Sequence, residues 1–239
     1  MRIAELFTSL QGEGLLAGTP STFVRSSGCN LRCRWCDTPF TSWRPEGEEW
    51  TAERIVEAVE DLGVSHVVLT GGEPLVSADA AAVCTALRAD GRHLTIETAG
   101  TVIPPGLGDE WPADLLSISP KLASSAPPEG TAGGWRRRHE AARRRDDLLG
   151  AMLRTTAWQL KFVVATREDL DETLAWLDDL GRAAGTAGLP RHRVFVMPEG
   201  TDAAALRALA AWLEPACTAE GLRFAPRHHI AWFGNRRGT

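Results

Sequence analysis

The sequence lacks the features that mark membrane proteins, secreted proteins and proteins that coat nucleic acids. It contains no run of about 18 or more apolar residues, so no membrane-spanning helix is expected. Its start, MRIAELFTSLQGEG, has neither the long apolar core nor the small-residue cleavage site of a signal peptide. Positive charge is not in excess, because the formal net charge is −5. These absences favour a cytoplasmic protein with no membrane partner and no direct nucleic-acid partner.

Internal repeats and low-complexity tracts are also missing from the chain. Its 239 residues, of which 44% are hydrophobic, are enough for a substantial core. We expect a single domain over residues 1–239, with an N-terminal extension at about residues 1–20 and an insertion at about residues 124–147. The insertion is rich in Pro and Gly and then strongly basic. We interpret it as a mobile segment followed by a solvated helix face; the alternative is a basic patch for an acidic or phosphate-bearing partner.

Cysteine is scarce, and its distribution is uneven. Three of the five cysteines fall within eight residues, in the pattern C-x3-C-x2-C formed by Cys29, Cys33 and Cys36. In a reducing compartment such a cluster indicates metal or redox chemistry and not disulfides. Cys84 and Cys217 stand alone in Ala-rich, helix-like stretches, where we expect them to be small buried hydrophobic residues.

A fourth ligand for a closed zinc site is missing. Structural zinc sites use four ligands, and no second cysteine pair is present; His66 and His93 lie inside predicted strands, where we expect satisfied strand residues. A [4Fe–4S] cluster normally takes four cysteines. Three cysteines would leave one iron open to bind a substrate directly, so the spacing favours a catalytic cluster over a structural one.

Short apolar runs alternate with helical patterns along the chain. One such pattern begins at Thr51, a candidate N-cap, and ends at Gly63. This alternation predicts parallel β/α units, in which the carboxyl ends of the strands carry the chemistry. The predicted strands cover residues 22–25, 66–70, 93–97, 115–119, 159–164 and 193–197.

Polar residues follow three of these strands. The motif TGGEP at 70–74 offers a tight glycine turn and the acceptor Glu73. ETAGT at 97–101 and SPK at 119–121 supply further hydrogen-bonding groups. Each motif alone is also typical of ordinary turns. Their succession at neighbouring strand ends indicates a ligand site.

The cysteine motif, with Trp35 before its last cysteine, and the later TGGEP together resemble the radical S-adenosylmethionine (SAM) superfamily. The resemblance implies that Cys29, Cys33 and Cys36 hold a [4Fe–4S] cluster whose fourth iron binds the methionine end of SAM. The reduced cluster would cleave SAM to a 5′-deoxyadenosyl radical. It also implies an α/β fold, a partial TIM-like (β/α) barrel of about six parallel strands with reduced helices.

More selective motifs narrow the resemblance. SLQGEG at 9–14, CDT at 36–38, FVR at 23–25, QLKFVV at 159–164 and VMPEG at 196–200 resemble the 7-carboxy-7-deazaguanine synthase family. That family implies conversion of 6-carboxy-5,6,7,8-tetrahydropterin to 7-carboxy-7-deazaguanine, with hydrogen abstraction at C6, loss of ammonia and a need for Mg²⁺. The pathway implied is queuosine or related 7-deazapurine biosynthesis, and a homodimer and a flavodoxin- or ferredoxin-type reductant are also implied.

The resemblance assigns ligands to residues, with no catalytic side chain beyond the cluster and SAM. Physically, Arg25 suits a carboxylate because its guanidinium can pair bidentately. Thr38 is the implied Mg²⁺ ligand, since Mg²⁺ keeps waters and substrate oxygens as its other ligands. The implied SAM contacts are Trp35, Cys36, Asp37, Gly72, Glu73, Glu97, Thr98, Ser119, Pro120, Lys121 and Gln159. The implied substrate contacts are Leu10, Gln11, Gly12, Glu13, Gly14, Arg25, Thr70 and His228, the last chosen from the adjacent pair His228 and His229.

Two other functions remain to be distinguished from this one. A glycyl-radical-enzyme activase shares the cysteine spacing but has no need of LQGEG or CDT. A structural zinc-binding module would bind zinc and be colourless. Detection of 5′-deoxyadenosine with the carboxylated pterin, and a brown colour that is lost in Cys33→Ala, would separate these functions from the synthase.

Overall fold

The structure is a computed structural model that describes residues 1–107, 111–154 and 157–239. One nine-stranded sheet runs through it in the order β3-β1-β2-β4-β5-β6-β7-β8-β9. Its central strands are β2 (Pro20–Ser26), β4 (His66–Gly71), β5 (His93–Thr98), β6 (Leu115–Ile118), β7 (Trp158–Val164) and β8 (Val194–Pro198). Every neighbouring pair among these six is parallel. The prediction of an α/β partial barrel with six parallel strands is confirmed.

Three strands were not predicted from the sequence. β1 (Arg2–Leu10) pairs antiparallel with β2, and β3 (Glu48–Glu49) pairs antiparallel with β1. β9 (Arg223–Phe224) extends the other edge in parallel to β8. Most positions of strand β1 are half-buried and only Ile3 is buried, and this pattern is weaker than the continuous apolar runs of the central strands. The first half of the predicted N-terminal extension is therefore a strand of the main sheet.

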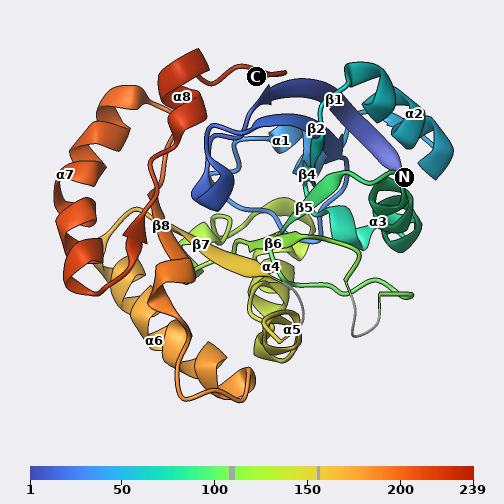
Figure 1. Cartoon of the computed structure of the whole chain (residues 1–239). Coiled ribbons are helices and arrows are strands. Elements are labelled where there is room, and N and C mark those ends of the chain that lie inside the picture. The colour runs from blue at the N-terminus through green and yellow to red at the C-terminus, as the bar shows by residue number, and fades with distance from the viewer. Residues whose placement is uncertain (108–110, 155–156) are drawn as a thin grey trace.

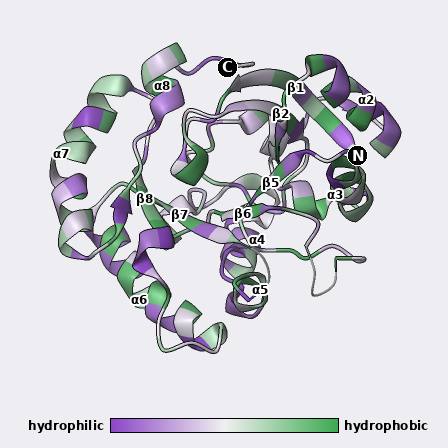
Figure 2. Cartoon of the chain, viewed as in Figure 1, coloured by the Kyte–Doolittle hydropathy of each residue, from purple (hydrophilic) through white to green (hydrophobic). Residues whose placement is uncertain are grey.

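The helices are α1 (Pro39–Ser42), α2 (Ala52–Leu62), α3 (Ala80–Ala89), α4 (Trp135–Arg143), α5 (Asp146–Met152), α6 (Arg167–Ala183), α7 (Ala203–Ala219) and α8 (His228–Phe233). Of these, α2, α3, α5, α6 and α7 lie around the outside of the curved sheet (Figure 1). Hydrophobic and hydrophilic residues alternate along α6 and α7 in Figure 2, as in amphipathic helices that pack on a sheet. None of the helices in the described ranges is long and apolar enough to cross a membrane.

Local signals in the sequence define the helix ends. Thr51 caps α2 by accepting a hydrogen bond from the backbone N–H of Arg54, and Gly63 ends the helix with a φ of 69°. Thr166 and Asp169 form a capping box at the start of α6. These caps place the apolar side of each helix against the sheet.

The core lies between the sheet and these helices. Trp176 of α6 packs edge-to-face on Phe162 of β7, with ring centroids 5.9 Å apart, and both residues are fully buried. Cys84 and Cys217 are also fully buried in this core, as predicted. His66 bonds to Ser21 and Thr95 inside the sheet, which agrees with its prediction as a satisfied strand residue.

The barrel stays open between its first and last strands, and the C-terminal segment bridges this gap. The backbone N–H of His228, at the start of α8, donates to the carbonyl of Gly12. Arg237 then reaches Glu5 on β1 at 3.0 Å and Glu46 at 3.1 Å. Figure 1 shows the C-terminus beside β1. The C-terminal segment therefore closes the open side of the barrel.

Candidate functional site

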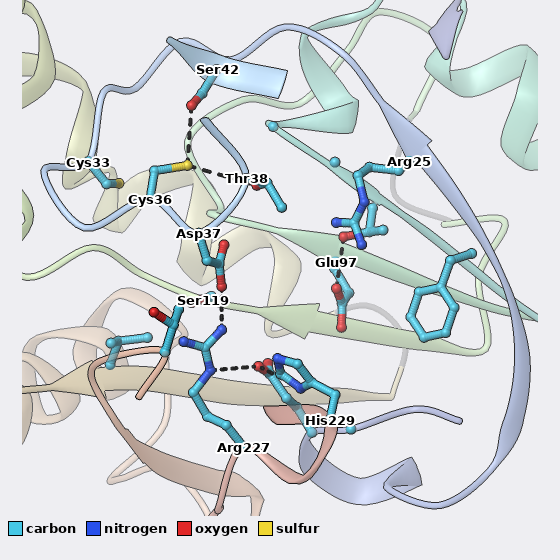
Figure 3. A pocket seen from close by; sticks show the side chains of 18 of the residues that line it. Arg25, Cys33, Cys36, Asp37, Thr38, Ser42, Glu97, Ser119, Arg227 and His229 are labelled. Carbon is cyan, nitrogen blue, oxygen red and sulfur yellow. Dashed lines mark hydrogen bonds and ion pairs between the residues drawn. The ribbon is translucent and has the colours of Figure 1, made fainter. Parts of the chain in front are cut away.

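A cavity of about 700 Å³ opens at the carboxyl ends of the parallel strands. Its floor includes Thr70 from β4, Glu97 from β5 and Lys161 from β7. The loop after β2 forms one side, and the C-terminal segment forms another. Figure 3 shows the labelled side chains of these walls pointing into the space between them. Parallel β/α folds place their ligand sites at this edge of the sheet, so this cavity is the candidate site.

The three clustered cysteines line one side of the cavity. They lie on the loop between β2 and α1, whose ends are joined by a 2.8 Å hydrogen bond from Gly28 N to Thr41 O. Burial raises the pKa of Cys29 to about 12 and that of Cys33 to about 11. These two thiols therefore keep their protons at neutral pH until a metal displaces them.

The donor set fits a [4Fe–4S] cluster with three protein ligands. Within the described ranges, no three His, Cys, Asp or Glu side chains converge closely enough to hold a single metal ion. A cube binds each thiolate through a different iron, so its ligands surround the cluster and need not converge on one point. The three free thiols face one cavity, which leaves room beside them for a further ligand.

The GGE motif holds two loops of the site together. The buried Glu73 carboxylate accepts hydrogen bonds from Ala99 N at 2.7 Å, Thr98 Oγ1 at 2.9 Å and Leu75 N at 3.2 Å. Burial raises the pKa of this carboxyl, and these hydrogen bonds oppose the rise. A Cβ on Gly72 would lie 2.3 Å from the carbonyl oxygen of Gly28, so only glycine lets the motif pack on the cysteine loop.

A buried lysine joins two carboxylates on the floor of the cavity. Lys161 Nζ lies 3.0 Å from Glu13 Oε2 and 3.1 Å from Glu97 Oε1, and the lysine side chain is 4% exposed. Burial lowers the lysine pKa, but the charges of Glu97 and Glu13 outweigh burial and raise it overall. Lys161 is therefore charged at neutral pH and partly neutralises the two acids. Glu97 also accepts a 2.8 Å hydrogen bond from Thr70.

A second cation, Arg227, links the cysteine loop to the loop between β1 and β2, which holds Glu13. It pairs with Asp37 and lies 3.4 Å from Glu13 (Figure 3). Burial alone would raise the pKa of Glu13, but the charges of Lys161 and Arg227 hold it well below its usual range. Glu13 therefore stays ionised in the cavity. Asp37, predicted to contact SAM, lines the cavity, and one of its carboxylate oxygens is paired with Arg227.

The histidine that lines the cavity on the C-terminal side is His229, and the predicted His228 does not line it. His229 lines the cavity, with its Nδ1 3.9 Å from Glu13, and burial lowers its pKa so that the ring is neutral near pH 7. His228 stacks on Trp232 instead, with ring centroids 5.0 Å apart. Neighbouring residues on a helix are about 100° apart, so only one of two adjacent histidines can face the cavity.

Arg25 lies on the β1–β2 side of the cavity, where it shares its partner Glu5 with the tail residue Arg237. Its Nε donates to Glu5 at 2.8 Å, and its guanidinium carbon lies 5.6 Å from the centre of the Phe7 ring. Neither of its terminal amino groups has a hydrogen-bond partner in the described parts of the chain, and the residue lines the cavity. Arg25 is therefore held from behind with donors available to a ligand.

Most predicted site residues line this one cavity. They are Leu10, Gln11, Gly12, Glu13, Arg25, Cys29, Cys33, Trp35, Cys36, Asp37, Thr38, Thr70, Gly72, Glu97, Thr98, Ser119 and Lys121. Gly14, Glu73, Pro120, Gln159 and His228 do not line it. Gln159, predicted beside SAM, instead accepts a hydrogen bond from Leu15 N and donates one to Ser117, and a Cβ on Gly14 would meet its side chain at 2.5 Å. Gln159 therefore supports the loop between β1 and β2 from outside the cavity.

Several lining residues were missed from the sequence. The most important are Lys161, Arg227 and the tail residues Asn235, Arg236, Arg237, Gly238 and Thr239. His229 was named only as the alternative to His228. Lys161 carried a signal, since a lysine inside an otherwise apolar strand is rarely buried unless it is paired. The spacing of the tail residues gave no such signal, because they reach the site only through contacts with distant residues across the open barrel.

Comparisons with known proteins agree with this geometry. The model of the radical SAM superfamily matches residues 23–121. The 7-carboxy-7-deazaguanine synthase of Rhodopirellula baltica is 43% identical over 99% of this chain and 88% of its own. That of Halobacterium salinarum is 44% identical over 99% of this chain and 92% of its own.

A solved structure supports the fold. The crystal structure of QueE from Escherichia coli is similar with a TM-score of 0.65 at 23% identity, covering 95% of this chain and 94% of that one. At this identity the likeness bears on the fold alone, and the two full-length relatives bear on the family. The chain therefore belongs to the 7-carboxy-7-deazaguanine synthase family of radical SAM enzymes.

Proposed function

We propose that this chain converts 6-carboxy-5,6,7,8-tetrahydropterin to 7-carboxy-7-deazaguanine with loss of ammonia, using a [4Fe–4S] cluster, SAM and Mg²⁺. The observation that carries the proposal is the single cavity that joins the cysteine loop to a polar floor of Glu13, Lys161 and Glu97. Relatives along nearly the whole chain carry this activity in their names. The continuous sheet supports the further proposal that residues 1–239 act as one unit.

The cysteine side of the cavity is proposed to hold the cluster and SAM. Cys29, Cys33 and Cys36 would bind three irons, and the fourth would take the methionine end of SAM. When bound and reduced by one electron, this pair supplies the 5′-deoxyadenosyl radical that abstracts hydrogen at C6 of the substrate. Glu73 would support this side indirectly, because its carboxylate binds the loop after β5 and does not line the cavity.

The remaining SAM contacts are proposed from residues that line the same side. Gly72 suits close backbone approach because its neighbours leave no room for a side chain. Lys121 Nζ donates to both oxygens of Ser119, at 2.9 and 2.8 Å, which holds the two residues together at the end of β6. Trp35, Asp37, Thr98, Ser119 and Lys121 line the cavity and complete this proposed set.

The opposite side suits a planar, anionic pterin. Gln11 and Glu13 offer acceptors to the amino and ring N–H groups of such a substrate, with Lys161 and Arg227 keeping Glu13 ionised. Glu97, which the resemblance assigns to SAM, bonds to Gln11 and Lys161 on this side, and we propose it as a further acceptor for the substrate. Thr70 and His229 line the same side. Because the acids are already oriented by fixed partners, the site would bind the ring without reorganising.

The substrate carboxylate is proposed to bind Arg25. Arg25→Ala is expected to raise the KM for the pterin by about 100-fold, since a charge-assisted bidentate pair contributes roughly 1.5–3 kcal/mol. Uncoupled cleavage of SAM should persist in this variant because the cysteine side is unchanged. Steady-state kinetics and 5′-deoxyadenosine analysis measure the two effects. An unchanged KM would refute the carboxylate contact, and Arg44→Ala, an exposed arginine outside the cavity, is the control.

Thr38 is proposed as the protein ligand of Mg²⁺. Its side chain lines the cavity, 3.8 Å from Cys36 Sγ, and its Oγ1 accepts from Thr41 Oγ1 at 3.4 Å. Thr38→Ala is expected to lower turnover by about 10- to 100-fold and to weaken the response to added Mg²⁺. Iron content should be unchanged. Thr38→Ser keeps the hydroxyl and should keep both activity and the Mg²⁺ response; equal loss in the two variants would exclude a ligand role.

The overall proposal is tested by anaerobic reconstitution with iron and sulfide, followed by assay with the carboxylated pterin, SAM, Mg²⁺ and dithionite. Formation of 7-carboxy-7-deazaguanine, identified by mass spectrometry, is the expected result. Cleavage of SAM without this product would point to a different radical SAM reaction, such as glycyl-radical activation. Colourless protein that holds zinc and no iron would support a structural zinc module instead.

Three further properties remain predictions of the family resemblance. A homodimer is expected in solution and can be measured by light scattering. A flavodoxin- or ferredoxin-type protein is expected to deliver the electron in place of dithionite. A cytoplasmic location is expected from the sequence.

A further inference from the structure

Glu5 of β1 lines the cavity beside Arg25 of β2. The two residues lie directly opposite each other in the antiparallel pair of strands. Opposite side chains on one face of such a pair are within reach of each other, and Arg25 Nε donates to Glu5 Oε2 at 2.8 Å. The sequence analysis gave Glu5 no role, because nothing in one sequence shows which residue of β1 meets Arg25.

A shift in strand register creates this contact. Ile3 lies opposite Ser26. In a regular antiparallel ladder, Ala4 would then lie opposite Arg25. The register shifts between Ile3 and Glu5, so Glu5 takes that place. Irregularities of this kind are frequent next to active sites, where they change the direction of a side chain. The strand therefore departs from regular pairing at the residue that meets Arg25.

Glu5 occupies one edge of the Arg25 guanidinium. A carboxylate can pair with two nitrogens along the edge that includes Nε, or along the edge made by the two terminal nitrogens. Because Glu5 holds Nε, only the second edge is available to a ligand in the cavity. The guanidinium carbon also lies 5.6 Å from the centre of the Phe7 ring, which stacks on Phe23 with ring centroids 5.2 Å apart. The direction of the free edge is therefore set before a ligand arrives.

Arg237 of the C-terminal tail holds Glu5 through its other oxygen. Arg237 Nε donates to Glu5 Oε1 at 3.0 Å, so each oxygen of this carboxylate accepts from one arginine. Arg237 is itself held by Glu46 at 3.1 Å and by the Phe40 ring, whose centre lies 3.7 Å from the guanidinium carbon. The Glu5 side chain is only 13% exposed, so water competes little for its oxygens. The carboxylate is therefore fixed by two partners.

We infer that Glu5 is a positioning residue for the reacting carbon of the substrate and acts through Arg25. This inference rests on the proposed function, in which Arg25 binds the substrate carboxylate. That carboxylate is attached to C6, the atom from which hydrogen is abstracted. The direction of the free edge of Arg25 therefore determines where C6 lies. Because Arg237 holds the same carboxylate, the position of C6 also depends on the tail being closed across the barrel.

Glu5→Gln is expected to lower kcat without raising the KM for the pterin. The variant removes a negative charge beside Arg25, so the attraction for the substrate carboxylate is kept and KM should stay within about threefold of wild type. Its single amide oxygen can accept from only one of the two arginines. With C6 out of place, kcat should fall about tenfold, and 5′-deoxyadenosine formed per product should rise by a similar factor. Glu5→Ala, which holds neither arginine, should show the larger change.

A double-mutant cycle with Arg25→Ala separates positioning from a structural role. In Arg25→Ala no guanidinium is left for Glu5 to orient. Adding Glu5→Gln to this variant should therefore change the ratio of 5′-deoxyadenosine to product by less than about twofold. If Glu5→Gln instead causes its full effect in the Arg25→Ala background, Glu5 acts independently of Arg25 and the inference is overturned. A raised KM with an unchanged kcat in Glu5→Gln would overturn it as well, because Glu5 would then contribute to binding and not to positioning.

Glu46→Gln is the matched control. Glu46 pairs with the same Arg237, and its replacement removes the same charge, but Glu46 is exposed and does not line the cavity. This variant should keep the kcat, the KM and the 5′-deoxyadenosine ratio of wild type. A loss equal to that of Glu5→Gln would overturn the inference, because removal of any negative charge beside the tail would then explain the effect.

A second readout needs no substrate and separates this inference from the proposed function. In reconstituted protein that contains ¹⁵N-labelled arginine, the Nε–H signal of Arg25 is assigned by its loss in Arg25→Ala. Glu5→Ala should speed exchange of this proton with water by about tenfold or more, and Glu46→Gln should leave it unchanged. Equal exchange in wild type and Glu5→Ala would overturn the inference. Slow exchange that depends on Glu5, in a wild type that forms no 7-carboxy-7-deazaguanine, would reject the proposed function and leave the orientation of Arg25 by Glu5 intact.

Discussion

Cys33→Ala is expected to yield a folded, colourless protein with no detectable turnover. Cys33 lines the cavity, is 9% exposed, and its backbone carbonyl accepts a 3.0 Å hydrogen bond from Trp43 Nε1 that the substitution keeps. Alanine removes only one sulfur from a buried side chain that borders an existing cavity, so the loss of stability should be about 1 kcal/mol. The loss of a cluster ligand, in contrast, removes the group on which the proposed chemistry depends.

The measurements are iron content, the visible absorbance of reconstituted protein and 5′-deoxyadenosine formation. Cys84→Ala is the matched control, since Cys84 is fully buried in the core and lies outside the cavity. It should keep iron, colour and activity while losing some stability. Full iron content and activity in Cys33→Ala would contradict the cluster assignment, and loss of colour in both variants would show that misfolding is responsible.

The parallel sheet and the cysteine side of the site could be predicted from sequence because both depend on local patterns. Continuous apolar runs mark strands buried on both faces, and the C-x3-C-x2-C loop holds its three ligands within eight residues. Glu73 shows the limit of a motif. The sequence places Glu73 at the end of β4, as the structure does. Its hydrogen bonds to Ala99 and Thr98, which hold the loop after β5, were not predicted.

The substrate side was harder to predict because its contacts join distant segments. Lys161 meets Glu13 across 148 positions of sequence, and Arg227 meets Asp37 across 190. Neither pairing leaves a spacing that can be recognised in one sequence. The sequence alone could not show which of His228 and His229 lines the cavity, since α8 is positioned by its contact with the distant Gly12.

Replacing Lys161 with methionine is expected to destabilise the protein by roughly 3 kcal/mol at pH 7, because breaking a buried ion pair leaves its partners uncompensated. Methionine keeps the length of the side chain but removes the charge that lies between Glu13 and Glu97. Burial, which raises the pKa of Glu13, would then be opposed mainly by Arg227. Turnover should fall as well, since the two acids would take up protons or move apart.

The pH dependence has a definite sign. In the wild type the pKa of Glu13 is lower folded than unfolded, so its stabilising contribution is present above the ordinary glutamate pKa and is lost as the pH falls below it. In Lys161→Met the buried, ionised carboxylate of Glu13 destabilises the folded protein, and this destabilisation disappears when the carboxylate is protonated. The difference in unfolding free energy between the two proteins should therefore be largest near pH 7 and narrow towards pH 4.

Denaturant unfolding at several pH values measures this difference. The chain has only one other lysine, Lys121, whose Nζ bonds to the uncharged oxygens of Ser119, so Lys121→Met is the matched control and should show little pH-dependent loss. Lys161→Met/Glu97→Gln removes one uncompensated acid and should recover part of the stability but not the turnover. The loss of stability in Lys161→Met could instead be independent of pH and remain in the double variant. That result would mean that Lys161 stabilises the cavity floor by packing and not by compensating charge.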